Sequence, residues 1–243
     1  MITAASNSRI KRLVQLNQKS KLRRTEDVFL AEGVKMFLEA PREQLQEVYV
    51  SESFLEKCSC REHLEEVGYE VVSDSVFSKI SDTCTPQGVL CVLKQFHYNI
   101  EEMLRDKAPL FLLLENIQDP GNLGTMLRTG EGAGVSGIIM SRDTVDLYNP
   151  KVIRSTMGSI YRVPFYYAED FAAAVHQVQQ AGVSVYAAHL RGKNSYACQD
   201  YTKGTAFLIG NEGNGLREET AELADCYIRI PMEGKVESLN AAV

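Results

Sequence analysis

Five short apolar runs in the second half of the chain constrain its fold more than any other feature. Each is six or seven residues long, and most are followed by turn residues and then by a segment with helical periodicity. Such runs are typical of strands that are buried on both faces. Their alternation with helices predicts a mixed or parallel sheet covered on both faces. The runs lie at 110–115, 136–141, 183–189, 205–210 and 226–231, with helices expected near 122–132, 150–157, 170–181 and 215–223.

The first part of the chain has a shorter series of the same kind and predicts a domain of its own. A chain of 243 residues is long enough for two ordinary domains, each with its own core. We expect an α/β domain over 1–97, a polar linker over 98–108 with room for a helical turn, and a second α/β domain over 109–243. In the first domain, helices are expected at 8–17, 34–40, 53–68 and 74–82, and strands at 28–33, 47–51, 69–73 and 87–96.

Charge is distributed unevenly along the chain. The formal net charge of −6 argues against indiscriminate binding of polyanions. A basic run nevertheless precedes the first acidic residue, Glu26. It is either a solvated helix face or a local footprint for nucleic acid. The run consists of Arg9, Lys11, Arg12, Lys19, Lys21, Arg23 and Arg24.

Membrane and metal signals are weak in this sequence. No apolar run approaches the roughly 18 residues that span a bilayer. No apolar segment of signal-peptide length follows the first basic residues, so a cytoplasmic protein is expected. The six cysteines lack the paired spacing of a zinc site and the four histidines lack ligand spacing, so no metal is expected.

The stretch 116–134, NIQDPGNLGTMLRTGEGAG, directly follows the first apolar run and contains five glycines. A dinucleotide-binding turn needs G-x-G-x-x-G in the turn itself, whereas three of these glycines lie at the expected helix end. They are expected to allow close packing and to stop the helix. Asn122 is the expected N-cap, and Arg128 projects from a different face than the apolar residues.

Two later stretches carry further polar groups. The first, FLIGNEGNGLREE at 207–219, places a glycine-rich loop between a strand and a helix. Backbone N–H groups in such a loop can bind an anionic or polar ligand, although a plain turn has the same composition. Glu212 either caps the helix or points into a site. The second, YIRIPMEGKVESLNAAV at 227–243, ends a strand and begins a helix at Ser238, a suitable N-cap.

Together the three stretches resemble the signature motifs of the SpoU/TrmH group of SPOUT RNA methyltransferases. The resemblance runs from residue 109 to the end of the sequence and includes the intervening NPKVIRSTMGSIYRVPF. It implies an α/β domain with a deep trefoil knot, an exception to the rule that chains do not thread loops. It also implies a homodimer that binds S-adenosylmethionine and methylates a ribose 2′-OH in RNA. FLAEGVKMFLEA and TPQGVLCVL resemble the ribosomal L30e fold, which implies an RNA substrate-binding domain and RNA contacts by the basic run.

The resemblance further implies roles for individual residues. Arg128 corresponds to the family's catalytic arginine. Because a guanidinium does not lose its proton, we expect Arg128 to hold a substrate phosphate and to stabilise negative charge on O2′. The other implied catalytic residues, which would orient Arg128 and the ribose, are Asn122, Glu212, Ser238 and Asn240. The implied cofactor-binding residues are His189, Leu190, Gly210, Asn211, Glu212, Gly213, Ile230, Pro231, Met232, Ser238, Leu239 and Asn240.

Three questions about function stay open at this point. The sequence stops three residues after Asn240, where family members continue into a further helix, so that helix is expected to be missing. A catalytically inactive RNA-binding protein and a base-methylating SPOUT enzyme are the alternatives to a ribose methyltransferase. An L30e-like domain favours rRNA over tRNA as the substrate, because related domains recognise structured RNA by shape and exposed nucleotides.

Overall fold

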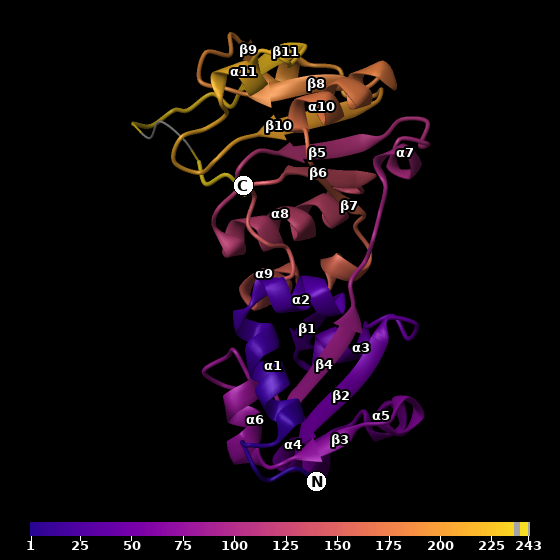
Figure 1. Ribbon diagram of the computed structural model, residues 1–243. Coiled ribbons are helices and arrows are strands. Elements are labelled where there is room, and N and C mark those ends of the chain that lie inside the picture. The colour runs from indigo at the N-terminus through magenta and orange to yellow at the C-terminus, as the bar shows by residue number, and fades with distance from the viewer. Residues whose placement is uncertain (236–238, 243) are drawn as a thin grey trace. The chain divides into compact units, whose positions relative to one another are not determined.

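The computed structural model describes residues 1–235 and 239–242. The chain divides into two compact units, each with its own sheet (Figure 1). The first unit consists of Met1–Phe96 and Asp146–Tyr161. The second consists of His97–Val145 and Arg162–Val243. Both units contain helices and strands, so the expected α/β class is confirmed. No described helix is long and apolar enough to cross a membrane.

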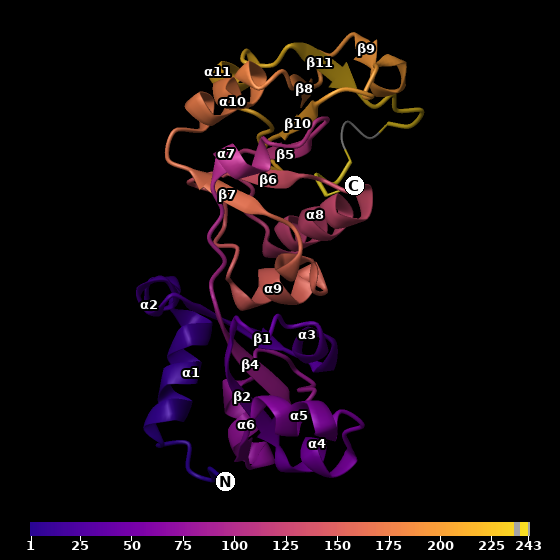
Figure 2. The ribbon, with the colours of Figure 1, turned by 90° about the vertical axis from the view of Figure 1, so that its right-hand side faces the viewer.

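The first unit is built on a mixed four-stranded sheet in the order β1-β4-β2-β3. β4 pairs antiparallel with β1 and β2, and β2 pairs parallel with β3. Figure 2 shows α1 on the opposite side of this sheet from α3, α4 and α5. The strands are β1 (Val28–Glu32), β2 (Leu45–Ser51), β3 (Glu70–Val72) and β4 (Val89–Lys94), and the helices are α1 (Ser8–Gln18), α2 (Ser20–Glu26), α3 (Val34–Leu38), α4 (Glu52–Lys57), α5 (Arg61–Val67) and α6 (Asp74–Ile80).

The helices of this unit differ from the sequence prediction in two places. The prediction of a single helix over 53–68 is wrong, because α4 and α5 are separate helices and the backbone of Cys58, between them, is extended. The short α2 was not predicted at all. Of the residues of α2, all of which the structure describes, Arg23 alone is buried, and a buried arginine adds nothing to an apolar periodicity that could predict a helix. Asp27 ends α2 in the left-handed conformation.

Residues 146–161 pack into the first unit although they lie far along the chain. Helix α9 (Pro150–Thr156) contacts β1. The Tyr148 ring lies 4.8 Å from the Phe29 ring, centroid to centroid. The Tyr148 hydroxyl donates to the backbone carbonyl of Phe96 at 3.1 Å, and the Tyr161 hydroxyl donates to that of Met36 at 3.0 Å. Buried aromatic rings and satisfied hydroxyls therefore fix this segment in place.

The second unit is built on a seven-stranded sheet in the order β7-β6-β5-β10-β8-β11-β9, and every pairing in it is parallel. The five strands expected from the apolar runs are confirmed as β5, β6, β8, β10 and β11. The short β7 and β9 were not predicted. The strands are β5 (Leu110–Leu114), β6 (Gly137–Ser141), β7 (Phe165–Ala168), β8 (Ser184–Ala188), β9 (Asn194–Ser195), β10 (Thr205–Ile209) and β11 (Cys226–Arg229).

Helices lie on both faces of this sheet, as the alternating pattern predicted. Figure 2 shows α8 (Pro120–Ala133) and α10 (Phe171–Gln180) on opposite sides. Phe111 and Leu113 of β5 join the core beneath α10 and α7 (Ile100–Met103), whereas Leu112 faces α8. α7 therefore packs in the core of the second unit, within the segment that the sequence predicted to be a polar linker.

The strand order brings the ends of β5 and β10 together. From β5 the chain adds β6 and β7 on one side, then crosses to β8 and returns to place β10 between β5 and β8. Because all the strands are parallel, their carboxyl ends meet at one edge of the sheet. This reversal is a topological switch point, where open α/β sheets bind ligands. The loops that follow β5 and β10 are those of the first two sequence motifs.

Candidate functional site

Helix α8 begins two residues earlier than the sequence predicted. Asp119 is its N-cap, with its carboxylate accepting the backbone N–H of Asn122 at 2.8 Å, and Pro120 occupies the first helical turn. The prediction that Asn122 caps the helix is therefore wrong. Asp and Pro are favoured at the N-cap and first turn respectively, which explains the earlier start. The Asn122 side chain is consequently available for another partner.

That partner is Glu212, from the loop after β10. Its carboxylate accepts the backbone N–H of Asp119 at 2.9 Å, the backbone N–H of Gln118 at 3.1 Å and the side-chain Nδ2 of Asn122 at 3.1 Å. Glu212 therefore does not act as a cap for its own helix. It ties the loop of the first motif to the loop of the second across the switch point.

The surroundings of Glu212 favour its charged form. Partial burial alone would raise the pKa of this carboxyl. The hydrogen bonds from the backbone N–H groups of Asp119 and Gln118 and from the Asn122 side chain outweigh that effect, so the pKa lies below its ordinary value. A carboxylate that accepts several N–H groups is held as an anion at neutral pH. Glu212 is thus a fixed acceptor and is poorly suited to shuttling protons.

Arg128 lies on α8, on the turn that follows Asn122 and Gly124. It is exposed, and among the residues that the structure describes it makes no hydrogen bond or ion pair. An exposed, unpaired guanidinium on a well-anchored helix is available to an anionic ligand.

Two of the glycines near the end of α8 have the structural roles that the sequence predicted, close packing and helix termination. Gly134 ends α8 with a φ of 73°, and a Cβ on Gly130 would lie 3.1 Å from the Val135 side chain.

The loop after β10 folds tightly on itself. The backbones of Asn211 and Gly215 exchange two hydrogen bonds, at 3.0 and 2.9 Å, and the Asn211 Oδ1 accepts the N–H groups of Gly213 and Asn214. A Cβ on Gly210 would lie 2.2 Å from the backbone of Gly215, so only glycine allows this close approach. The Asn211 Nδ2 donates to the backbone carbonyl of the loop after β5, which fixes the two loops together.

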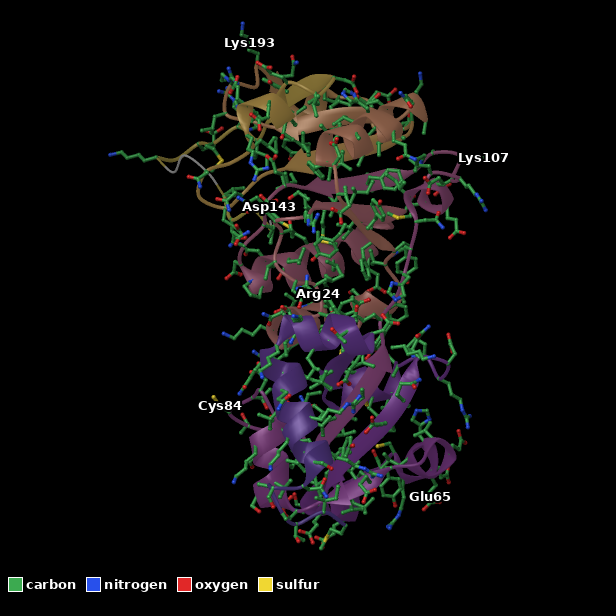
Figure 3. All side chains as sticks on the ribbon, in the orientation of Figure 1. Arg24, Glu65, Cys84, Lys107, Asp143 and Lys193 are labelled. Atoms are coloured by element: carbon green, nitrogen blue, oxygen red, sulfur yellow. The ribbon has the colours of Figure 1, made fainter. Side chains whose placement is uncertain are left out.

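Sequence reasoning missed three charged residues that support this loop. Glu115, at the end of β5, has only 2% of its side chain exposed and accepts the backbone N–H of Arg217 at 2.8 Å. The Arg217 guanidinium pairs with both Glu115 and Asp143. Asp143 lies in the loop after β6 and is labelled in Figure 3. An acid that ends an otherwise apolar run, as in PLFLLLE, was the available signal for Glu115.

Asp143 is held as an anion in this network. Its partial burial would raise the pKa of the carboxyl, but the hydroxyl of Ser141 and the guanidinium of Arg217 hold that pKa below its ordinary value. Its backbone carbonyl accepts the side chain of Gln118 at 2.6 Å. The ends of β5, β6 and β10 are therefore joined by one network of polar groups.

The remaining predicted cofactor residues lie in the loops after β8 and β11. The N–H of His189 donates to the carbonyl of Ile228 at 3.0 Å, so the loop after β8 lies beside the end of β11. The His189 ring lies 4.9 Å from that of Tyr227. Leu190 is 70% exposed, Ile230 48% and Leu239 46%, so these loops present apolar side chains to solvent.

Those of the other cofactor-binding residues predicted after β11 that the structure describes lie at or near the surface. Pro231 and Asn240 are exposed and Met232 is half-buried. The Asn240 Oδ1 accepts the N–H of Ala242 at 2.8 Å, so in this structure it serves a local turn. Ser238 lies outside the described residues.

Six of the seven predicted RNA-binding residues divide into two groups. Arg9 pairs with Glu70 at 3.1 Å, and Arg12 bridges Glu26 and Glu47, both at 2.7 Å. The charges of these two arginines are neutralised within the unit. The other group is exposed and makes no side-chain hydrogen bond or ion pair among the described residues; it comprises Lys11, Lys19, Lys21 and Arg24, the last of which is labelled in Figure 3.

Arg23, the seventh residue predicted to contact RNA, is buried. It is 3% exposed, pairs with Asp146 at 2.6 Å and donates to the carbonyls of Leu16 and Asn17. A side chain buried in this way has no surface to offer RNA, so the expected RNA contact is wrong for Arg23. Its role is to join α1 and α2 to the segment that begins at Asp146.

The described residues include no group of three or more His, Cys, Asp or Glu side chains that could hold a metal ion. In the part of the chain that the structure describes, the site consists of backbone donors, the unpaired Arg128 guanidinium, oriented carboxylates and exposed apolar side chains. A parallel sheet with such groups at its switch point is typical of α/β proteins that bind a ligand at their strand ends.

Comparison with known proteins identifies the family. The model of the SpoU rRNA methylase family matches residues 109–243, and that of the MRM3-like substrate-binding domain matches residues 7–91. The chain belongs to the SpoU rRNA methylase family, as the sequence motifs predicted. A relative from Bacillus subtilis, 23S rRNA (guanosine(2553)-2′-O)-methyltransferase RlmP, is 32% identical over 245 residues, which cover 100% of this chain and 94% of the relative.

Solved structures agree with this assignment. An rRNA methyltransferase from Sinorhizobium meliloti with bound AdoMet superposes with a TM-score of 0.84 at 30% identity, covering 99% of this chain and 92% of that one. The SpoU methyltransferase AviRb from Streptomyces viridochromogenes, in complex with AdoMet, gives a TM-score of 0.87 at 25% identity, covering 97% and 93%. The second unit thus has the fold of SPOUT methyltransferases.

Proposed function

We propose that this protein transfers a methyl group from S-adenosylmethionine to a ribose 2′-OH of rRNA. The observation that carries the proposal is the contact of Glu212 with Asn122 and with the backbone of residues 118 and 119. This contact joins the glycine-rich loop to the start of the helix that bears the unpaired Arg128. The relative from Bacillus subtilis modifies a guanosine of 23S rRNA, which favours rRNA as the substrate class.

The residues present fit S-adenosylmethionine. Exposed Leu190, Ile230 and Leu239 offer apolar surface for an adenine ring, and the loop at 210–215 offers backbone N–H groups and carbonyls for its polar edge. We infer that these segments and His189 hold the cofactor, with Ser238 and Asn240 completing the site. When bound, the cofactor supplies a methyl group that is already activated on its sulfonium centre.

The protein's own groups then position the ribose. Because the Asn122 Nδ2 is committed to Glu212, its Oδ1 is left facing away as a hydrogen-bond acceptor for a hydroxyl. Arg128 holds the adjoining phosphate and stabilises the negative charge that develops on O2′ as the O–CH3 bond forms, the S–CH3 bond breaks and the hydroxyl proton passes to water. Neither role requires Arg128 to give up a proton, and Glu212 acts by orienting Asn122.

Three finer features follow from family membership. We propose that the second unit contains the deep trefoil knot, that the protein works as a homodimer through that unit, and that it acts in the cytoplasm. The strand order, with β10 inserted between β5 and β8, supports a threaded carboxyl-terminal segment. Size-exclusion chromatography with light scattering tests the dimer, and a monomer that retains full activity would overturn it.

The first unit is proposed to be an L30e-like domain that binds the RNA substrate. The match to a substrate-binding domain over residues 7–91 supports this role. The exposed, unpaired cations are the groups that can neutralise phosphates, and the paired Arg9 and Arg12 and the buried Arg23 contribute less. The proposed contacts are therefore made by Lys11, Lys19, Lys21 and Arg24.

Incubation of the protein with labelled S-adenosylmethionine and total RNA tests the activity. We expect label in rRNA with the unaltered protein, almost none with Arg128→Ala, and near-normal transfer with Arg142→Ala, a matched exposed arginine that is paired with Glu169. Cofactor affinity should be unchanged in Arg128→Ala. Retained transfer by Arg128→Ala would remove that residue from its role.

The same experiment separates the alternatives. If the protein is an inactive RNA-binding protein, neither the unaltered protein nor any of the variants transfers label to RNA. A ribose 2′-O-methyl group blocks alkaline cleavage at the adjoining phosphodiester, whereas a methyl group on a base leaves that cleavage intact. Digestion of the labelled RNA in alkali therefore distinguishes ribose methylation from base methylation.

A further inference from the structure

Glu115 is a buried carboxylate whose side-chain partners, among the described residues, are all hydrogen-bond donors. Its Oε2 accepts the backbone N–H of Arg217 at 2.8 Å, and its Oε1 accepts the hydroxyl of Thr220 at 2.5 Å and the guanidinium of Arg217 at 3.4 Å. Only 2% of the side chain is exposed. An ionised carboxylate accepts at both oxygens and donates nothing, so these neighbours match its charged form.

The groups that Glu115 holds lie immediately after the glycine-rich loop. Arg217 is the N-cap residue of α11 (Glu218–Ala221) and makes no side-chain cap of its own, while Thr220 is 7% exposed within that helix. The backbone N–H of Glu115 in turn donates to Ile209 at 2.9 Å, directly before the loop begins. One residue at the end of β5 therefore fixes both ends of the segment between 209 and 217.

The side chain of Arg217 extends this arrangement to a third strand. Its guanidinium pairs with Asp143, whose carboxylate also accepts the hydroxyl of Ser141 at 2.6 Å. Glu115 is thus connected, through Arg217 and Asp143, to the ends of β5, β6 and β10. Asn211 and Glu212 anchor the middle of the loop, whereas Glu115 anchors its two ends.

We propose that Glu115 is a positioning residue for the cofactor, acting through Arg217 and Thr220 on the shape of the loop at 210–217. Glu115 has almost no exposed surface and so touches neither the cofactor nor the RNA. If the loop occupies its binding shape for a smaller fraction of the time, apparent cofactor affinity falls by that fraction, while the bound complex keeps the same geometry. This inference rests on the proposed function, because it concerns the same cofactor site.

The test uses the full chain and measures cofactor binding without RNA or turnover. Thr220→Val removes one hydroxyl bond to Glu115 at nearly constant volume, and Glu115→Gln removes the charge. Thr205→Val is the matched control: Thr205 is also buried, at 2% exposure, but its hydroxyl donates to the carbonyl of Lys203 at the opposite end of β10. Calorimetric titration with S-adenosylmethionine gives the Kd, thermal unfolding gives the Tm, and initial rates give kcat.

We expect both test variants to raise the Kd for S-adenosylmethionine about tenfold, with kcat at saturating cofactor within about twofold of the unaltered protein. Thr205→Val should lower the Tm without changing the Kd. An unchanged Kd in Thr220→Val and Glu115→Gln, whatever happens to the Tm, overturns the proposal, as does a loss confined to kcat. If the unaltered protein itself does not bind the cofactor, the proposed function has failed and the positioning role fails with it.

Discussion

Replacement of Glu212 by glutamine offers the sharpest test of how the two motif loops are joined. The carboxylate accepts the N–H groups of Gln118 and Asp119 and the side chain of Asn122. In Glu212→Gln one oxygen becomes an NH2 group, which faces an N–H donor and repels it. The variant therefore loses the charge and one acceptor but keeps its volume.

The expected loss in the free energy of unfolding depends on how far the N–H donors are exposed to water. Hydrogen bonds to a charged acceptor contribute about 1.5–3 kcal/mol where they are buried. Gln118 and Asp119 are exposed, so water replaces part of what is lost, and we expect a loss of about 1–2 kcal/mol in the free energy of unfolding. For a chain of this length that corresponds to a fall in Tm of roughly 4 °C.

The effect should depend on pH with a definite sign. The pKa of Glu212 is lower in the folded protein than its ordinary value of 4.5, so its contribution is complete above that value. It is lost as the pH falls through the folded pKa, and the stability difference between the unaltered protein and Glu212→Gln should therefore close in acid. Urea unfolding at about pH 7 and about pH 3 measures both ends of this range.

Glu169→Gln is the control, because Glu169 forms an exposed ion pair with Arg142 in the same unit. It should change the free energy of unfolding by less than about 0.5 kcal/mol. Hydrogen exchange gives a local readout, since the amides of Gln118 and Asp119 should exchange faster only in Glu212→Gln. A destabilisation equal at both pH values, or unchanged exchange of those amides, would refute the reasoning.

Three further predictions concern other parts of the chain. Gly210→Ala places a Cβ 2.2 Å from the backbone of the same loop and should lower the free energy of unfolding, measured by thermal unfolding, by about 1–3 kcal/mol. In the control Gly213→Ala the nearest atom to the new Cβ lies at 3.7 Å, and the loss should be under about 0.5 kcal/mol. Asp146→Asn leaves a buried guanidinium without its anion; because Asp146 is 28% exposed, we expect a loss of about 2 kcal/mol in urea unfolding, below the range for fully buried pairs. Arg24→Ala should reduce the slope of log RNA affinity against log salt by about 0.7–0.9, and Arg9→Ala, already paired, by clearly less; equal slopes would contradict the division.

The sequence predicted the elements whose signal is local. Apolar runs located β5, β6, β8, β10 and β11, because a strand buried on both faces is largely apolar; β6 is buried throughout, whereas in β11 only Ile228 is buried and Arg229 is exposed. The start of α8 was harder to place, since Asp119, Pro120 and Asn122 all favour a helix start and only the hydrogen bonds decide among them. The two residues of β9 are too few to leave any periodic pattern.

The error at Arg23 and the omission of Glu115 have a common physical cause, which is pairing over long distances in sequence. Arg23 belongs to a run of similar cations, and nothing local distinguishes the one that turns inward to meet Asp146, 123 positions later. Likewise the acceptor in Glu115 and its donor in Thr220 are separated by 105 positions. Motif comparison identified Asn122, Arg128 and Glu212, but the contact between Asn122 and Glu212 needed coordinates.

The attachment of residues 146–161 to the first unit bears on how this family can be recombined. The segment lies inside the stretch that matches the methylase family, yet Asp146 pairs with Arg23 and Tyr161 with Met36 in the substrate-binding portion. Consider a chimera that joins a relative's amino-terminal portion to this enzyme at a single junction. It would replace Arg23 and Met36 by the relative's residues while keeping Asp146 and Tyr161, so the two partners of each contact would come from different proteins. A functional graft must carry two pieces of sequence, so changes in RNA specificity among relatives should involve coordinated substitutions on both sides of the junction.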